Sequence, residues 1–465
     1  MLKVDFNNMT SQILGQQHGI NIEDNVKLDK VWLQSCYDSV KAERGLGWQE
    51  WMLLPQASEQ FLDEILDYAK RIKDSASDLV VFGIGGSALG VQSVASALTH
   101  LRFNSLSRGV RKAPRLHIED NIDPLRFGSL LDVIDLENTH FLIATKSGNT
   151  SETLSQFLCI YDLLIKNVGK QKAVEAITII TGFGKGDLYD VAKVEGFKMY
   201  EVPKGAGGRF SVLSSVGLVA FAMIGLDIKQ LLRGARSMID KSFEPDIFAN
   251  PALMTAYLQV KSIKSGKNIG VIMPYSDNLK YIADFYAQLW AESLGKEKDK
   301  DGNTINTGQT PVKSLGVTDQ HSLVQLFNEG PFDKVVTFVS VMDFGKVVPI
   351  PKVEGVNIGE FLSGHTLNEL LQAERIATEF ALTNSKRPNF NIVLDKLDEF
   401  AIGELLSYFM MQTAFAGALL NIETYLQPGV EAGKVATFAM LNRKGYEDIK
   451  KAILTTPKND KYIVG

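Results

Sequence analysis

The stretch Thr145-Lys-Ser-Gly-Asn-Thr-Ser-Glu-Thr153 decides the fold and points to a binding site. It follows an apolar run at residues 141–144, which predicts a short buried strand, and precedes residues 154–165, which have the pattern of a helix. Five hydroxyl side chains and one lysine therefore lie where a strand ends and a helix begins. The N-terminus of a helix leaves backbone N–H groups unpaired and carries partial positive charge, so it favours an anion. We therefore predict a phosphate-binding loop formed by Thr145, Lys146, Ser147 and Thr150.

The simpler alternative for this loop is a polar turn ahead of a well-capped helix. Asn149 is then the expected N-cap, and Glu152, three positions on, completes a pattern like a capping box. Three hydroxyl residues alone would favour that alternative. The five that accompany Lys146 favour the phosphate-binding loop.

A glycine-rich loop, Gly83-Ile-Gly-Gly-Ser87, occupies the same kind of position earlier in the chain, between a predicted strand at residues 78–82 and the start of a helix. It fits the dinucleotide-binding pattern G-x-G-x-x-A, but that pattern also requires an acidic residue about 20 positions on, at the end of the next strand. Glu119 is the nearest candidate and lies too far along, so a nicotinamide-dependent enzyme is disfavoured. We interpret Gly86 and Ser87 as a second wall of the phosphate-binding site, which is compatible with a tight structural turn.

Strand and helix patterns alternate along most of the chain. Further strands are predicted at residues 115–118 and 176–181, and the alternation restarts with strands at 268–273, 335–341 and 391–394. Such alternation predicts parallel sheets with helices on both faces. We therefore expect an α/β fold of two tandem αβα sandwiches with mainly parallel sheets, plus helical N- and C-terminal segments. The expected boundaries are a helical segment at 1–70, a first sandwich at 71–235, a second at 236–403 and a C-terminal helical segment at 404–465.

Composition limits the classes of partner. The 465 residues exceed one ordinary core, and 49 basic against 54 acidic residues give a net charge of −5 without a basic block. Nucleic acid is therefore disfavoured as a partner, although a small anion needs only a local positive site. Cys36 and Cys159 are too few for a disulfide framework and are expected to be buried. The start of the sequence lacks a signal-peptide pattern and no apolar run is long enough for a bilayer, so we expect a cytoplasmic protein without membrane contact.

Four further residues are candidates for chemistry. Arg209 follows two glycines, which would let the backbone approach a ligand, although a surface loop is an equally good explanation. Glu292 continues the apolar helical stripe of Ile282, Phe285 and Leu289, so its carboxylate is aimed toward the buried side near the negative end of a helix. That environment suits a general base, while a structural glutamate paired with an arginine is the alternative.

His321 is predicted to lie at the first turn of a short helix that is capped by Thr318 or Asp319. A helix start favours a neutral ring that can exchange protons near pH 7. Lys434 interrupts an otherwise apolar helical face that includes Val430 and Leu441. It either extends its ammonium to solvent or faces an anion, and the first is commoner.

Together these motifs resemble the phosphoglucose isomerase family over residues from about 80 to 434. Gly207-Gly-Arg-Phe-Ser-Val-Leu-Ser-Ser-Val-Gly217 is similar to the family's first signature, and Gln427-Pro-Gly-Val-Glu-Ala-Gly-Lys434 to its second. Residues 291–296 and 319–322 resemble the family's catalytic segments. The loops at Ser87 and at 145–150 resemble those of its sugar-phosphate-binding sandwiches, the sugar isomerase domains.

The resemblance implies interconversion of glucose 6-phosphate and fructose 6-phosphate without a metal or an organic cofactor. It assigns Glu292 as the base that moves a proton between C2 and C1, and Arg209 as the cation that stabilises the cis-enediolate. It implies that His321 and Lys434 assist ring opening. The phosphate would be held by Ser87, Thr145, Lys146, Ser147 and Thr150, and the sugar by Gln427 and Gly208. Members of the family are usually homodimers in which that histidine comes from the neighbouring subunit.

Two alternatives remain open at this point. A bifunctional phosphoglucose/phosphomannose isomerase would use the same sandwiches and the same enediol chemistry, and activity on mannose 6-phosphate would distinguish it. A regulator that only senses sugar phosphates would keep the two phosphate-binding loops. Such a regulator has no need of Glu292, Arg209, His321 and Lys434 together.

Overall fold

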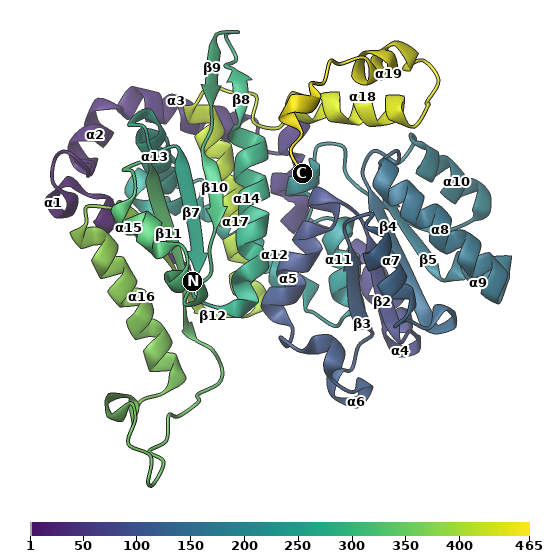
Figure 1. The fold of residues 1–465 in the computed structure, drawn as a ribbon, viewed down its shortest axis with the longest axis horizontal. Helices are drawn as coiled ribbons and strands as arrows, with labels where there is room; N and C mark the ends of the chain where they lie inside the picture. Colours follow the sequence, from purple (N-terminus) through teal and green to yellow (C-terminus); the bar gives the residue numbers. More distant parts are fainter. Residues whose placement is uncertain (1) are drawn as a thin grey trace. The chain divides into compact units, whose positions relative to one another are not determined.

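The first sandwich is built on a five-stranded sheet in which every strand is parallel to its neighbours (Figure 1). The computed structural model describes residues 2–465. In spatial order the strands are β3 (Arg115–Glu119), β2 (Asp78–Phe82), β4 (Thr139–Thr145), β5 (Ile177–Thr181) and β6 (Lys198–Glu201). β2, β4 and β5 are buried at every position, as expected for parallel strands covered on both faces.

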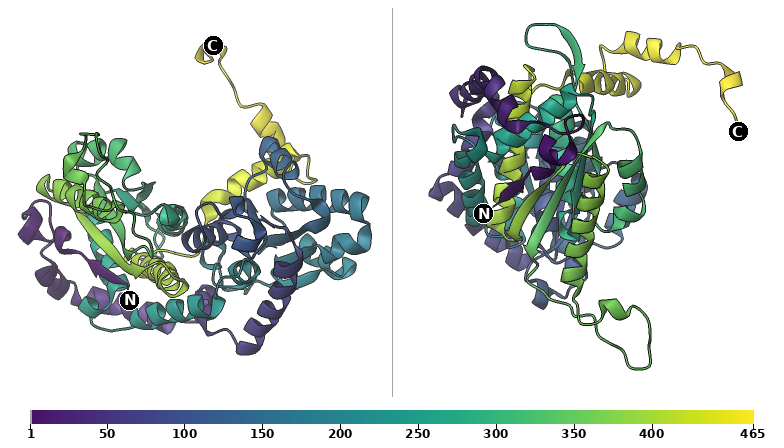
Figure 2. Two further views of the ribbon diagram at one scale, coloured as in Figure 1. Left: turned by 90° about the horizontal axis from the view of Figure 1, so that it is seen from below. Right: turned by 90° about the vertical axis from the view of Figure 1, so that its left-hand side faces the viewer.

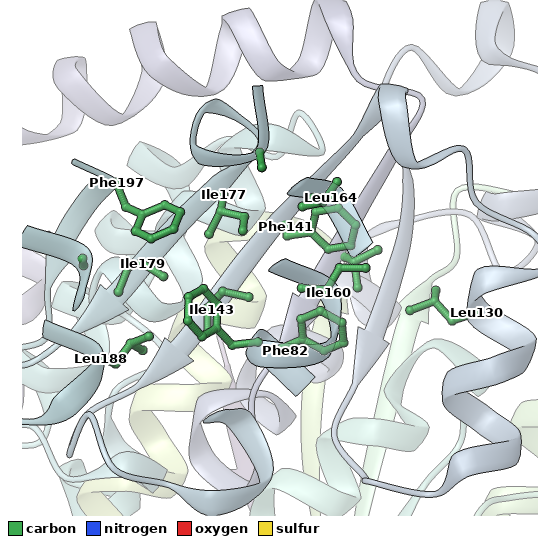
Figure 3. Close-up of a cluster of buried hydrophobic side chains, with 14 residues drawn as sticks. Phe82, Leu130, Phe141, Ile143, Ile160, Leu164, Ile177, Ile179, Leu188 and Phe197 are labelled. Atoms are coloured by element: carbon green, nitrogen blue, oxygen red, sulfur yellow. The ribbon is translucent and has the colours of Figure 1, made fainter. Parts of the chain in front are cut away.

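Helices cover both faces of this sheet. One face carries an apolar cluster that includes Phe82, Phe141, Ile160 and Phe197 (Figure 3). The helices on that face are α7 (Pro124–Leu131), α8 (Ser151–Val168), α9 (Lys170–Glu175) and α10 (Asp187–Glu195). On the other side of the sheet lie α4 (Glu59–Ser75), α5 (Leu89–Leu98) and α11 (Ser215–Met223).

A buried ionic network joins the first two strands of this sheet. Asp78 in β2 is fully buried and pairs with Arg115 at 2.7 Å and with His117 at 2.8 Å, both in β3. Burial raises the pKa of Asp78, but hydrogen bonds from His117, Arg115 and Ser77 outweigh it and lower the pKa to about 2. The carboxylate is therefore ionised in the folded protein at neutral pH, and its partners satisfy it.

The second sandwich has a mixed sheet. Its strands in spatial order are β1 (Lys3–Asp5), β12 (Asn389–Lys396), β11 (Lys334–Asp343), β7 (Ile269–Pro274) and β10 (Thr310–Lys313). Only β1 is antiparallel to its neighbour. α15 (Val324–Glu329) and α16 (Leu367–Asn384) contribute to a cluster on one face. Another group of helices, α13 (Pro251–Lys264), α14 (Lys280–Leu294) and α17 (Glu399–Leu419), packs together against the same sheet.

Helix α17 packs closely against α12 (Ile228–Lys241). Two glycines make this contact possible: a Cβ on Gly234 would lie 1.9 Å from the carbonyl oxygen of Phe400, and one on Gly403 2.0 Å from that of Leu231. Neither position tolerates a side chain without moving a backbone. Helices α5 and α14 also pack together, and the hydroxyl of Ser93 donates to the carbonyl of Tyr281 at 2.7 Å, so the two sandwiches share an interface.

The expected fold class of two αβα sandwiches with mainly parallel sheets is confirmed. Some expectations were wrong in detail. Residues 3–5, expected to be helical, form β1, and β6 and β10 were not expected. The hairpin of β8 (Lys296–Lys298) and β9 (Thr304–Thr307) was also missed. Cys36 is buried as expected, whereas Cys159 is exposed because its position on α8 faces solvent.

The chain forms two compact units, one ending at Thr424 and the other comprising Tyr425–Gly465. The second unit contains α18 (Glu431–Met440) and α19 (Glu447–Leu454). Within the first unit, the connection between β11 and α16 extends away from the second sheet (Figure 2). Nowhere in residues 2–465 is a helix both long enough and apolar enough to cross a bilayer.

The order of strands in the first sheet marks a place for a ligand. β2 lies between β3 and β4, so the chain leaves β2 toward one side and later returns to its other side. Ligands of open α/β sheets bind outside the carboxyl ends of the strands at such a switch point. The loops that follow β2 and β4 are the two predicted phosphate-binding loops.

Candidate active site

Three hydroxyl groups meet in the loop after β4. The Oγ1 atom of Thr145 lies 2.7 Å from Oγ1 of Thr150 and 3.5 Å from Oγ of Ser147. Ser147 and Thr150 are 3.3 Å apart, and the backbone N–H of Asn149 donates to Ser147 Oγ at 3.2 Å. The three hydroxyl groups are hydrogen-bonded to one another. Each can rotate its hydrogen, so all three can donate to an anion that binds beside the loop.

The N-cap of α8 differs from the expected one. Thr150, not Asn149, is the N-cap, and its side chain accepts no capping hydrogen bond from the first turn of the helix. Asn149 instead accepts from the backbone N–H of Asp187 at 2.8 Å, at the start of α10. Asn149 is thus hydrogen-bonded to α10, and the Thr150 hydroxyl is hydrogen-bonded to Thr145. The backbone N–H groups in the first turn of α8 can therefore donate to another acceptor, such as an anion.

Lys146 brings positive charge to this loop. Its ammonium donates to the carbonyl of Lys204 at 2.6 Å and lies 4.6 Å from the centre of the Trp48 ring. Burial lowers the pKa of Lys146 to about 8; Lys185 acts in the same direction and Glu50 opposes it. The side chain is therefore largely charged at neutral pH.

The glycine loop after β2 is packed directly against the loop that carries Arg209. Gly85–Ser87 and Gly208–Phe210 form two short 3-10 turns, η3 and η6. A Cβ on Gly86 would lie 2.1 Å from the carbonyl carbon of Gly208 and 2.4 Å from the nitrogen of Arg209. Only glycine permits this approach, which brings the half-buried Ser87 and the residue Arg209 to one place.

Arg209 is buried, which resolves the alternatives that the sequence left open. It is 4% exposed, and its Nε donates to Ser293 Oγ at 2.7 Å while Nη2 donates to the carbonyl of Thr424 at 2.9 Å. Its Nη1 lies 3.3 Å from Oε1 of Glu292. The guanidinium is thus a fixed buried cation beside a carboxylate.

Glu292 lies on α14, where Ile282, Phe285 and Leu289 are buried as the stripe predicts. Its side chain remains 25% exposed, so the carboxylate stands at the boundary between protein and solvent rather than within the core. The amide of Gln288, one turn earlier, donates to Glu292 Oε2 at 3.2 Å. The carboxylate is held from two sides and still reaches solvent, as a base that meets a ligand must.

Lys296 completes this end of α14. Its ammonium donates to the carbonyls of Glu292 at 2.9 Å and Ser293 at 2.7 Å, which are unpaired at the helix C-terminus. Burial lowers the pKa of Lys296 to about 8, Arg209 adds to this and Glu292 opposes it. A second positive group therefore stands beside the Arg209–Glu292 pair.

His321 is not where the sequence suggested. It is the last residue of a 3-10 turn, η9 (Thr318–His321), and not the first turn of the following helix, which starts at Val324. Asp319 causes the difference, because its carboxylate accepts from the N–H of Leu315 at 2.7 Å and from the hydroxyl of Ser322 at 2.7 Å, and so closes a separate turn. The neighbouring Gln320 accepts from Tyr275 at 2.7 Å, which anchors the turn to the second sandwich. His321 itself is exposed.

Gln427 and Lys434 belong to the unit Tyr425–Gly465. Gln427 precedes the 3-10 turn Pro428–Val430, and Lys434 on α18 pairs with Glu431 at 2.7 Å. The apolar helical face expected around Lys434 is not buried, since Val430 and Leu441 are exposed. The roles that the resemblance gives to Gln427 and Lys434 remain predictions.

The sequence did not single out Gln288, Ser293, Lys296 or the aromatic residue Trp48. Gln288 had a signal, because it lies one helical turn before Glu292 on the same face. Ser293 and Lys296 lie in the segment 291–296 that resembles a catalytic segment, but their contacts with Arg209 and with the end of α14 are seen only in the fold. Trp48 is recognised only from its contact with the distant Lys146. Within residues 2–465, no three His, Cys, Asp or Glu side chains are grouped so that they could hold a metal ion.

The arrangement can support proton transfer beside a developing negative charge. A carboxylate, Glu292, touches a buried guanidinium, and the adjoining loops contribute hydroxyls, helix N–H groups and Lys146 for an anionic group. A base close to a fixed cation is what removal of a proton next to a carbonyl requires.

Comparisons with known protein families, sequences and structures all point to one family. The family model described as phosphoglucose isomerase matches residues 60–451. A glucose-6-phosphate isomerase from Carboxydothermus hydrogenoformans is 43% identical over 464 residues, covering 100% of this chain and 99% of the relative. A crystal structure of a hypothetical protein from Thermus thermophilus has a TM-score of 0.85 and 33% identity, covering 95% of this chain and 100% of that one. The structure of a glucose-6-phosphate isomerase from Chlamydia trachomatis has a TM-score of 0.70 at 24% identity, covering 85% and 76%.

Proposed function

The chain belongs to the phosphoglucose isomerase family, and from this premise we propose that it is an aldose–ketose isomerase that interconverts D-glucose 6-phosphate and D-fructose 6-phosphate. The substrate is a small sugar phosphate, and the reaction serves glycolysis and gluconeogenesis. The proposed location is the cytoplasm. The scheme uses no metal ion and no organic cofactor.

One observation carries the proposal: the contact between Glu292 and the buried Arg209. A regulator that merely binds a sugar phosphate gains nothing from a carboxylate held at 3.3 Å from a guanidinium that is itself fixed by Ser293 and Thr424. An isomerase that proceeds through an enediolate needs both groups.

The phosphate group of the substrate binds at the carboxyl ends of β2 and β4. Thr145, Ser147 and Thr150 donate hydroxyl hydrogens, the first turn of α8 donates N–H groups, and Lys146 supplies positive charge. Gly86 and Ser87 form the opposite wall, and Gly208 lines the sugar. The close approach of Gly86 to Gly208 supports this arrangement, because it brings both walls next to Arg209.

The isomerisation is a proton transfer between adjacent carbons. Glu292 removes the proton from C2 of the open-chain aldose, and the electron pair moves into the C1 carbonyl to give a cis-enediolate. Arg209 stabilises the negative oxygen without changing position, since its other contacts fix the guanidinium. The hydroxyl proton then moves from O2 to O1, which leaves the negative charge on O2. Protonated Glu292 returns its proton to C1, and the electron pair on O2 forms the C2 carbonyl of the ketose. Atoms and charge balance over the cycle.

Ring opening precedes this step and involves His321 and Lys434 in the proposed scheme, while Gln427 contacts the sugar. His321 is exposed, so its ring is available to a second copy of the chain. The connection between β11 and α16 supports a homodimer, because it exposes Val356, Ile358 and Phe361. Exposed apolar side chains gathered on one loop mark an interaction surface.

A coupled assay tests the function. Purified protein is mixed with fructose 6-phosphate and a chelator, and glucose 6-phosphate is followed by its oxidation with NADP-dependent glucose-6-phosphate dehydrogenase. Steady turnover is expected; binding of the sugar phosphate without turnover would instead indicate a regulator. The same assay with mannose 6-phosphate as the substrate, using coupling enzymes free of phosphomannose isomerase, distinguishes the bifunctional alternative.

A further inference from the structure

We propose that Trp48 is a positioning residue: its ring holds the ammonium group of Lys146 in place for the phosphate group of the substrate. The inference rests on the proposed function and adds to it a residue that lies before the part of the chain matched by the family model. The segment that carries this residue, η2 (Gly47–Gln56), is far from the phosphate-binding loop in sequence.

Segment η2 is fixed at two points next to the site. The buried ring of Trp51 stacks on Phe210 in η6, with 5.0 Å between the ring centroids. Glu50 accepts a hydrogen bond from the backbone N–H of Gly205 at 2.8 Å. Gly205 must be glycine, because a Cβ there would lie 1.9 Å from the carbonyl oxygen of Gly47. The backbone that presents Trp48 is therefore attached to the loop that leads to Arg209.

Trp48 is itself 44% exposed, so burial of its indole is incomplete. A large aromatic side chain that remains partly in water gains little from the hydrophobic effect at that position. The indole ring instead contacts a charged group: the ammonium of Lys146 lies 4.6 Å from its centre. At that distance the negative face of the indole attracts a cation.

The charge of Lys146 is not neutralised by the groups that hold it. Within residues 2–465, no carboxylate lies within 4.0 Å of its ammonium, which donates to the carbonyl of Lys204 at 2.6 Å. Glu50 is the acidic group whose field reaches Lys146, but its carboxylate accepts from Gly205. A carbonyl and an aromatic face orient an ammonium group while leaving its full charge for an incoming dianion.

The charged groups that face Lys146 set its titration. Burial and Lys185 lower its pKa to about 8, whereas Glu50 raises it. Attraction to the indole favours the charged form in addition. Loss of the ring removes this attraction and releases the side chain from its place.

Four single variants and one double variant test the inference by steady-state kinetics on fructose 6-phosphate and by calorimetric titration with inorganic phosphate. Trp48→Leu removes the aromatic face, and Trp48→Phe retains one. Leu46→Ala, at an exposed residue just before η2, is the matched control. Lys146→Met removes the charge, and the double variant with Trp48→Leu closes a mutant cycle.

Trp48→Leu should raise KM and the phosphate dissociation constant about three- to tenfold, the size expected for one cation–π contact, with kcat within about twofold of wild type. Trp48→Phe should recover at least half of the loss on a logarithmic scale. In the Lys146→Met background the tryptophan substitution should change KM by less than about 1.5-fold.

The inference is overturned if Trp48→Leu binds phosphate like the wild type, if Trp48→Phe is as impaired as Trp48→Leu, or if the effect persists unchanged without the lysine. Circular dichroism checks folding of each variant, and Trp48→Gln replaces the leucine variant if the latter unfolds. Failure of the proposed function is distinguishable: the wild type would then show no turnover, while the calorimetric cycle would still report on Trp48 and Lys146.

Discussion

Replacing Arg209 with lysine should separate the position of the cation from its charge. A lysine keeps one positive charge, but its single nitrogen cannot reach the three groups that the guanidinium contacts in different directions. Those are Ser293 Oγ at 2.7 Å, the Thr424 carbonyl at 2.9 Å and Glu292 Oε1 at 3.3 Å. At least one buried acceptor therefore loses its donor.

The magnitude follows from these contacts. A buried acceptor left without a partner costs about 1–3 kcal/mol, so the variant should unfold at lower urea with a loss of this size. Misplacing the cation that meets the enediolate oxygen should raise the activation barrier by about 3–4 kcal/mol, equal to a loss of roughly 10²–10³ in kcat. KM should change much less, because the phosphate-binding loop is intact.

The assay is the coupled reaction on fructose 6-phosphate, with urea unfolding followed in parallel. Arg236→Lys is the matched control, since Arg236 is exposed and its pair with Asp240 spans 3.7 Å at the surface. The control should retain wild-type kcat and stability. If Arg209→Lys turned over within about threefold of the wild type, a fixed guanidinium would not be the enediolate stabiliser and the mechanism would be wrong.

Three other variants test the phosphate-binding loop, ring opening and the buried Asp78 network. Combining Ser147→Ala with Thr150→Ala should raise KM about tenfold or more by removing charge-assisted hydrogen bonds to the phosphate, whereas Ser155→Ala, on the exposed side of α8, should not; an unchanged KM would place the phosphate elsewhere. His321→Ala should slow turnover of cyclic glucose 6-phosphate at least tenfold yet spare C2 proton exchange on an acyclic phosphorylated aldose, and equal losses on both would remove the histidine from ring opening. The pKa of Asp78 is about 2 when folded, below its unfolded value, so its ionised form adds about 2 kcal/mol of stability that is present above about pH 5 and lost as pH falls toward 2. The difference in urea stability between the wild type and Asp78→Asn should therefore shrink over that range, and a constant difference would contradict the assignment.

The buried strands of the fold were predictable because each contains a run of apolar residues, such as 79–82 in β2 and 141–144 in β4. β2 was expected at residues 78–82 and is found there, since such a run between turn residues has few alternatives. β1 and β10 were missed because both are short and partly exposed. Their strand conformation depends on neighbours: β1 pairs with β12, almost 400 residues away in the chain, and that pairing has no local signal.

The candidate site was predictable residue by residue but not contact by contact. Glu292 was predicted from the apolar stripe of its helix. Its partner Arg209 could be placed only by the fold, because the hydrogen bonds of Arg209 reach Ser293 and Thr424, 84 and 215 positions away in the chain. Local competition explains the other differences. Asn149 serves the start of α10 instead of capping α8.

Solvent deuterium uptake reports directly on whether Glu292 moves a proton between C2 and C1. The wild type and Glu292→Gln are incubated with glucose 6-phosphate in D2O, and deuterium in the sugar and formation of fructose 6-phosphate are measured, with Glu329→Gln as the exposed-carboxylate control. We expect Glu292→Gln to lose both exchange and conversion by a factor of about 100 or more, while phosphate affinity and the control variant stay near wild type. Exchange and conversion by Glu292→Gln within about threefold of the wild type would contradict it.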